Sequence, residues 1–235
     1  MDAFAALLET FDHEFARFEA SPAIRLLRSD AFRVEHYASA LREIYFYTRD
    51  NPQQQCAMTL AFRGSQRQAV RRMVGHALDE VGHDRMALDD LRALGYDTES
   101  IPGEEPLPST MPLICHPTHL LASDCPIAYL GQIFFLEFLP TRAGAIYLEA
   151  LAAAGIPPEA TSFLAEHATV DEAHNRLMKR HVADLVQTDR DLARCQQALR
   201  TCAYMYAAML EGAFASAGAF TARQPRLDVE VHLEA

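Results

Sequence analysis

The sequence has little positive charge, and this shortage excludes one class of partner. It contains 21 Lys and Arg residues against 32 Asp and Glu residues, which gives a formal net charge of −11. Proteins that bind nucleic acids need clustered basic side chains to neutralise phosphates. We therefore expect no nucleic-acid partner. The chain also lacks a run of about 18 uncharged apolar residues, the length of a membrane-spanning helix, so we expect no membrane partner.

Two further absences concern location and cysteine chemistry. The first residues, Met1-Asp2-Ala3-Phe4, lack the basic segment of a secretory signal peptide, which predicts a cytoplasmic protein. No two cysteines form a C-x2-C pair, the spacing typical of zinc sites. Because the odd number and the reducing cytoplasm both disfavour disulfides, we expect free thiols at all five positions, Cys56, Cys115, Cys125, Cys195 and Cys202.

The apolar residues that are present predict helices. Half of the 235 residues are hydrophobic, and most apolar runs recur with a period of about 3.6 residues. This pattern predicts an all-α protein with one helical domain, residues 1–220, and a polar C-terminal tail, residues 221–235. The expected helices cover 2–19, 34–49, 52–63, 66–94, 124–140, 141–154, 159–186 and 188–217, with a short turn at 23–28. Residues 96–117 contain five prolines and are expected to be irregular.

The eight residues 167–174 carry the clearest chemical signal. On a helix, His167, Asp171 and His174 lie at positions i, i+4 and i+7 and therefore share one face. Two imidazoles and a carboxylate on one face can bind a transition metal. A second stretch has the same His-x3-acid-x2-His spacing: His76, Glu80 and His83.

A lone acid completes the expected metal site. Glu137 lies in the otherwise apolar run 131–139, and a carboxylate is costly to bury there unless it is paired or binds a metal. Glu and Glu-x-x-His ligands on facing helices are a known helical solution to di-iron binding, and mixed oxygen and nitrogen ligands suit iron or manganese. The expected ligands are Glu80, His83, Glu137, His167, Asp171 and His174, with His76 either a further ligand or an outer partner. His181, seven residues after His174, lies on the same helix face as His167, Asp171 and His174, at a position more typical of an exposed histidine.

Substrate-binding residues are less clearly marked. The tyrosines at 37, 45 and 47 either line a pocket or relay electrons near a metal, and pocket lining is the more common role of a buried tyrosine. We expect Tyr45 and Tyr47 to line the substrate pocket. Arg142 and Arg85 are candidates to bind a substrate carboxylate, because a guanidinium pairs with it through two hydrogen bonds.

At these residues the sequence resembles the haem-oxygenase-like di-iron oxidases, also called iron-containing redox enzymes. The resemblance spans roughly residues 5–215, and its most specific part is the third ligand element, His167, Asp171 and His174. It implies a bundle of about seven helices shared with haem oxygenase, TenA and PqqC. It further implies two iron ions, O2 as co-substrate, and a small carboxylate substrate such as an amino acid or a fatty acid. N-oxygenation, C–C cleavage, decarboxylation and desaturation are known in this group. A homodimer would suit it.

The sequence departs from this family at one position. Some members place an acid seven residues before the ligand histidine of the first element, and here that position is His76. Glu80 supplies an acid three residues before His83 instead. Whether His76 replaces a carboxylate ligand is therefore left open.

Four alternatives fit parts of the pattern. A ferritin-like di-iron protein would add Glu43 to the ligand set. A haem oxygenase would use His13 as the axial ligand. A TenA-like hydrolase would need no metal and would rely on a cysteine nucleophile. A non-catalytic helical binding module would need none of these groups.

Overall fold

The computed structural model describes residues 2–169 and 171–220, and the side chains of residues 171–175 and 219–220 also lie outside this description. Within that part of the chain the structure is helical and has no strand, which confirms the predicted class. The α-helices are α1 (Ala3–Glu19), α2 (Pro22–Leu27), α3 (Val34–Arg49), α4 (Asn51–Met58), α5 (Arg67–Asp79), α6 (His83–Ala93), α7 (Met111–Leu121), α8 (Tyr129–Ala153), α9 (Ser162–Thr169), α10 (Asp171–Leu185), α11 (Asp189–Ala215) and α12 (Ala217–Phe220). Short 3-10 turns join several of them.

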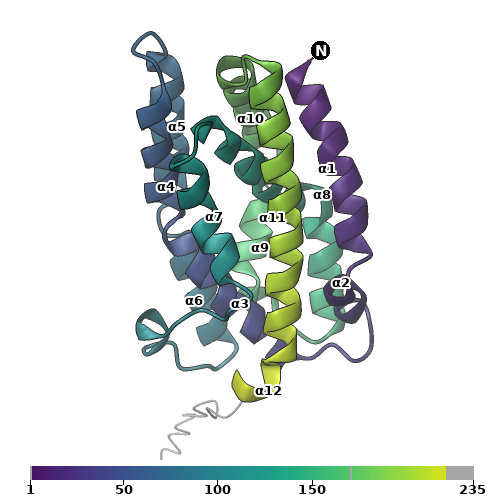
Figure 1. Ribbon diagram of the computed structural model, residues 1–235. Helices are drawn as coiled ribbons and strands as arrows, with labels where there is room; N and C mark the ends of the chain where they lie inside the picture. The colour runs from purple at the N-terminus through teal and green to yellow at the C-terminus, as the bar shows by residue number, and fades with distance from the viewer. Residues whose placement is uncertain (1, 170, 221–235) are drawn as a thin grey trace, which may run out of the picture.

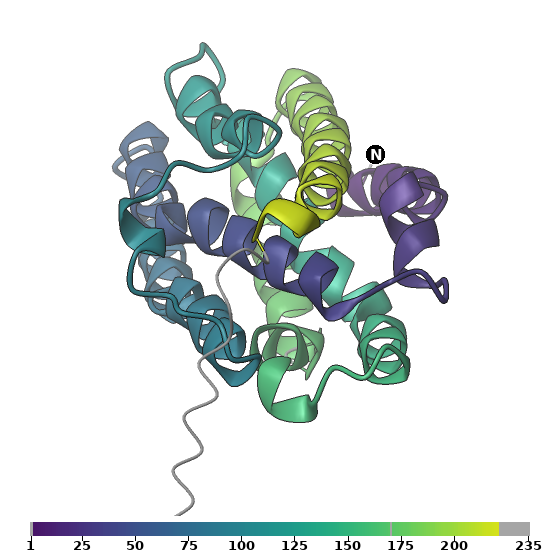
Figure 2. The same cartoon turned by 90° about the horizontal axis from the view of Figure 1, so that it is seen from below.

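The helices form a bundle around one apolar core (Figure 1). Seen from below, α3 crosses the middle of the bundle and is surrounded by the other helices (Figure 2). The long helices α8 and α11 pack closely at Gly131, where an added Cβ would lie 1.9 Å from the carbonyl oxygen of Cys195. On another side α8 meets α9 at Gly144, where a Cβ would lie 2.5 Å from that of Ala168. Glycine at both positions therefore lets α8 lie deep between its neighbours.

Local sequence signals explain several helix ends. The hydroxyl of Thr188 accepts a hydrogen bond from the N–H of Asp191, whose carboxylate accepts one in return from the N–H of Thr188. This capping box starts α11 where the sequence predicted it. Helix α3 also has its expected bounds. Helix α5 starts within one residue of its expected position, with Gln66 at the N-cap and no side-chain cap.

The helix expected over residues 66–94 is two helices. Helix α5 ends at Asp79 and α6 begins at His83, because Gly82 adopts a backbone φ of 105°. Side chains of L-residues rarely tolerate this left-handed conformation, and glycine does so readily. Glu80 therefore closes one helix and His83 opens the next, so the pair meets across a bend.

Two prolines proved weaker breaks than the sequence indicated. Helix α8 continues through Pro140, so the separate helices expected at 124–140 and 141–154 are one. Part of the segment expected to be irregular forms α7, which contains Pro117. Pro117 leaves the carbonyl of Leu113 without its usual helical donor, and the Gln132 side-chain amide donates to that carbonyl at 3.5 Å. The side chain of Gln132 thus supplies the hydrogen-bond donor that the proline lacks.

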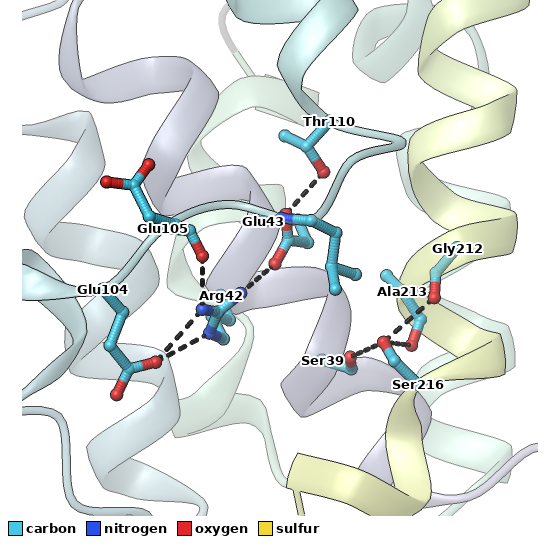
Figure 3. Close-up of polar contacts among 10 residues, drawn as sticks. Ser39, Arg42, Glu43, Glu104, Glu105, Thr110, Gly212, Ala213 and Ser216 are labelled. Atoms are coloured by element: carbon cyan, nitrogen blue, oxygen red, sulfur yellow. Dashed lines mark hydrogen bonds and ion pairs between the residues drawn. The ribbon is translucent and has the colours of Figure 1, made fainter.

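The segment between α6 and α7 is held on α3 by a buried ionic cluster (Figure 3). The wholly buried carboxylate of Glu43 is paired with the guanidinium of Arg42. It also accepts hydrogen bonds from the N–H of Leu107, at 3.0 Å, and from the hydroxyl of Thr110. Arg42 reaches Glu104 as well, at 3.1 Å. These contacts give the long connection a fixed path.

None of the helices in the described ranges has both the length and the apolar character needed to cross a membrane.

Candidate metal centre

The predicted ligands that the structure describes come together at one place between α5, α6, α8 and α9. One group consists of Glu80, His83 and His167, and the other consists of His76, Glu80 and Glu137. Within each group, one potential ligand atom from each residue lies within 4.8 Å of the others. Glu80 belongs to both groups. The arrangement therefore offers two neighbouring positions for a cation, joined by one carboxylate.

His76 lies between the two carboxylates. Its Nε2 atom is 3.0 Å from Oε1 of Glu137 and 3.9 Å from Oε1 of Glu80. Burial lowers the pKa of His76, but the two carboxylates outweigh this effect and raise the pKa above its usual value. The two carboxylates therefore favour the protonated form of this imidazole. This contact places His76 within the group and leaves open whether it is a ligand or an outer partner.

Glu80 is oriented by residues that the sequence did not single out. Its Oε2 atom lies 3.2 Å from Nδ1 of His83 and accepts a hydrogen bond from the Asn51 amide at 3.4 Å. The hydroxyl of Tyr129, which is fully buried, donates in turn to the amide oxygen of Asn51 at 3.2 Å. Asn51 is thereby fixed with its NH2 group toward Glu80. The Asn51-Pro52 pair had indicated only a helix boundary.

His167 is held in the form that can bind a metal. Its Nδ1 atom lies 2.6 Å from the carbonyl oxygen of Phe163, to which it can donate a hydrogen bond. Such a bond leaves the lone pair of Nε2 for a ligand. Burial lowers the pKa of His167, which favours the neutral imidazole. The ring stands edge-on to His83 with ring centroids 4.6 Å apart.

Asp90 joins the helices that carry His83 and His167. This wholly buried residue of α6 accepts hydrogen bonds from the N–H groups of Ser162 and Phe163, at 2.9 and 3.0 Å, and from the Ser162 hydroxyl. These groups form the start of α9. A carboxylate at a helix N-terminus accepts hydrogen bonds from the free N–H groups there and interacts favourably with the helix dipole. Asp90 was not predicted, because no local motif links residue 90 to residue 162.

Two predicted ligands, Asp171 and His174, have side chains outside the described part of the chain, so their roles stay predictions. His181, seven residues after His174, was expected to be exposed, and this was wrong. Its side chain is fully buried, its ring lies nearly parallel to that of His76 at 5.9 Å, and neither nitrogen has a hydrogen-bond partner in the described structure. Burial is the main reason that its pKa is lowered to about 3. It therefore stays neutral.

An apolar cavity of about 110 Å³ adjoins the centre, and His167 is part of its wall. Tyr47 and Tyr37 both line this cavity. Tyr45 is buried but is not part of this wall. Arg142 lies elsewhere, in an ion pair with Asp12 at 2.9 Å. Arg85 is exposed on α6.

The residues behind the alternative functions lie in other settings. Glu43 is occupied by the cluster of Figure 3 and is not in either metal-ligand group, which disfavours the ferritin-like ligand set. The side chain of His13 is 72% exposed and lies 3.1 Å from Glu14, which disfavours a role as the axial ligand of a buried haem. Burial raises the pKa of the thiol at three cysteines, Cys125, Cys195 and Cys202, and a raised pKa suppresses the thiolate that a nucleophile needs.

The donor set fits iron. Carboxylate oxygens and neutral imidazoles suit iron and manganese, and no thiolate competes within either group. The ligand atoms come from several helices, which are fixed to one another by Asp90, by the Asn51 contact and by the packing of α8. A cation could therefore bind without a large rearrangement of the backbone.

Comparisons with known proteins identify a family and a fold. The sequence pattern of the family described as iron-containing redox enzymes matches residues 38–207. A protein from Shewanella denitrificans, described as a domain of unknown function with a haem-oxygenase-like fold, superposes with a TM-score of 0.82. It is 22% identical and covers 94% of this chain and 96% of its own. A TenA homologue from Pseudomonas syringae gives a TM-score of 0.74 at 14% identity, over 89% and 91% of the two chains.

No curated protein matches the chain. The structural neighbours share the fold, and the family match covers more than half of the sequence. The chain therefore belongs to the family of iron-containing redox enzymes and has a haem-oxygenase-like fold.

Proposed function

We propose that this protein is a non-haem di-iron oxidase or oxygenase that uses O2 to oxidise a small organic substrate. The observation that carries the proposal is the pair of ligand groups that share Glu80. Two adjacent positions joined by one carboxylate are what a two-metal site requires. When bound, iron(II) would supply the electrons for O2 reduction. Manganese is the alternative metal.

The chain's own residues would divide the work at this centre. Glu80 would serve both positions, His83 and His167 would bind on one side, and Glu137 would bind on the other. Asp171 and His174 are proposed to complete the set. His76 would leave its contact with Glu137 as the metal binds, or would remain beside it. The apolar wall next to His167 would keep water away from the reacting substrate.

The lack of charged side chains in the cavity wall limits the choice of substrate. No Asp, Glu, Lys or Arg is among the described residues that line it, so a substrate carboxylate would find no guanidinium there. We propose that such a carboxylate is held at the metal end. This favours a fatty-acid-like molecule over an amino acid, whose second charge would have no partner. N-oxygenation, C–C cleavage, decarboxylation and desaturation remain the reaction types proposed for this fold.

A TenA-like hydrolase is the second candidate, because a TenA homologue shares the fold. That activity would need a reactive cysteine beside the cavity. None of the five cysteines is among the described residues of the cavity wall, and three have thiol pKa values raised by burial. The observations therefore favour the metal-dependent function. We further propose a cytoplasmic enzyme without nucleic-acid or membrane partners, with a homodimer as its expected assembly.

An anaerobic iron titration of metal-free protein, followed by mixing with O2, tests the proposal. We expect uptake of about two iron(II) ions per chain and rapid O2 consumption. Glu80→Gln should weaken both positions, because this residue belongs to both groups. Glu149→Gln is the matched control, an exposed glutamate of α8. Failure of the wild-type protein to bind iron, or full iron binding by Glu80→Gln, would contradict the proposal.

A further inference from the structure

The cavity beside the metal centre is elongated along α3. Tyr37, Ala40, Ile44 and Tyr47 of this helix all line it. A helix rises about 1.5 Å per residue, so Tyr37 and Tyr47 are separated by about 15 Å along the axis. A single water molecule needs about 10–15 Å³ on the same scale as the cavity's volume of about 110 Å³. The space therefore suits a narrow molecule of several heavy atoms.

The two ends of this cavity differ in their surroundings. The C-terminal end of α3 adjoins the metal centre, because Asn51, two residues after the helix, donates to Glu80 at 3.4 Å. At the opposite end Phe32 and Phe214 line the cavity and contact each other, with ring centroids 5.4 Å apart. Tyr37 belongs to this second, distal end. A molecule lying along α3 would thus present one end to the metal and the other to Tyr37.

Nearly every polar side chain in the cavity wall already has a partner. Tyr47 is hydrogen-bonded to Tyr206, and the hydroxyl of Tyr147 donates to Glu19 at 2.5 Å. His167 contacts the Phe163 carbonyl through Nδ1, and its other nitrogen belongs to the metal-ligand group.

Tyr37 is different. Its hydroxyl is buried and has no hydrogen-bond partner in the described structure. A buried hydroxyl without a partner is unfavourable and calls for an explanation. Burial, and to a lesser degree Asp90, raises the pKa of Tyr37, so the hydroxyl keeps its proton and can donate at physiological pH.

We propose that Tyr37 binds an uncharged polar group at the distal end of an elongated, otherwise apolar substrate. The group accepts a hydrogen bond from the Tyr37 hydroxyl, as an alcohol, ether or carbonyl oxygen would. A charged group is disfavoured there because no ionised side chain in the described cavity wall could balance it. The statement that the other end of this molecule is oxidised rests on the proposed function. The binding itself does not.

Binding of simple probes to the metal-free full-length protein tests the inference. n-Octanol and n-octane have similar apolar bodies, but only the alcohol can accept a hydrogen bond from Tyr37. We expect wild-type protein to bind n-octanol about three- to tenfold more tightly than n-octane, the range for one hydrogen bond in a buried site. Tyr37→Phe should abolish this preference and leave n-octane binding unchanged. Calorimetry or competition with an apolar fluorescent probe measures both affinities.

Tyr45→Phe is the matched control, because it removes a tyrosine hydroxyl from the same helix outside the cavity wall. It should keep the wild-type preference for n-octanol. Equal binding of the two probes by wild-type protein would overturn the inference, even if Tyr37→Phe failed to fold. Retained preference in Tyr37→Phe would also overturn it, because the alcohol would then be held by a polar group other than the Tyr37 hydroxyl. Because no iron or O2 is present, this result is independent of whether the iron titration succeeds.

Discussion

Two groups of buried carboxylates in this chain are satisfied in different ways. Around Glu43, on α3, the partners are the guanidinium of Arg42, the N–H of Leu107 and the hydroxyl of Thr110 (Figure 3). Around Glu80 and Glu137 the neighbouring groups are instead imidazoles, with one amide from Asn51. All three glutamates have side chains that are at most 10% exposed.

The difference shows how the donors around a buried acid indicate its role. A guanidinium stays charged and cannot bind a metal, and a backbone N–H cannot leave its place. The Glu43 cluster therefore has a structural role, which is to fix the segment between α6 and α7 on α3. An imidazole can lose its proton and become a ligand itself. Where imidazoles surround the carboxylates, the imidazoles can release their protons when a metal cation binds. The groups around Glu43 cannot respond in this way.

The largest effect on stability is expected at Glu43. Glu43→Ala leaves the guanidinium of Arg42, which is 13% exposed, without its buried partner. Removal of one member of a buried ion pair typically costs about 3–5 kcal/mol, and the expected loss should appear in urea unfolding. The folded fraction should still bind the wild-type amount of iron. Loss of iron with unchanged stability would break the comparison, because it would give Glu43 the role assigned to Glu80.

The second largest loss of stability is expected at Asp90. Asp90→Ala removes the acceptor for two backbone N–H groups and a hydroxyl at the start of α9, which is expected to cost about 2–3 kcal/mol in unfolding free energy. Because α9 carries His167, metal affinity should fall as well. Asp90→Asn keeps one acceptor oxygen and should therefore retain part of the stability and part of the metal affinity. If Asp90→Ala bound iron as tightly as wild type, the link between the cap and His167 would be refuted.

A gain in stability is expected at His181. His181→Leu replaces a fully buried imidazole, whose two nitrogens have no partner among the described residues, by an apolar side chain. The unfolding free energy should rise by about 1 kcal/mol. His119→Leu, at an exposed position, should change it by less than about 0.5 kcal/mol. A clear loss of stability or of iron in His181→Leu would show that this imidazole has a bound partner.

The smallest effect on stability is expected at Glu137. Glu137→Gln keeps the shape and a hydrogen-bonding oxygen next to His76, and the His76 imidazole, unlike a guanidinium, can become neutral. The unfolding free energy should therefore change by less than about 1 kcal/mol. Iron uptake should nevertheless fall by about one ion per chain, because Glu137 belongs to one ligand group only. A large loss of stability with full iron uptake would place Glu137 in the same class as Glu43.

The sequence predicted those elements whose signals are local. The regular apolar spacing placed α3 at its observed bounds and placed α11 within two residues of them. Prediction from the sequence failed where residues far apart in the chain determine whether a helix continues. Pro117 lies inside α7 because Gln132, fifteen residues later, satisfies the carbonyl that the proline leaves free. The bend at Gly82 was missed because a glycine inside a helical pattern is often tolerated.

The same limit applies to the metal centre. The His-x3-acid-x2-His spacing was enough to propose Glu80, His83 and His167, which the structure brings together with Glu137 and His76. The residues that orient them, Asn51 and Asp90, act across helices, and a single sequence carries no sign of such pairs. Arg142 shows the opposite error, because a plausible residue type was proposed for the pocket without any spacing to support it.

The close packing of α8 at Gly131 and Gly144 bears on how this protein can evolve. The two glycines lie six residues before and seven residues after Glu137, and a methyl group at either would push α8 away from α11 or α9. The carboxylate between them would then move with the helix. Apolar residues of the cavity wall can be exchanged for others of similar size with little penalty, so new substrates are accessible by mutation there. At the two glycines, which carry no chemistry, even a methyl group would instead disturb the helix packing.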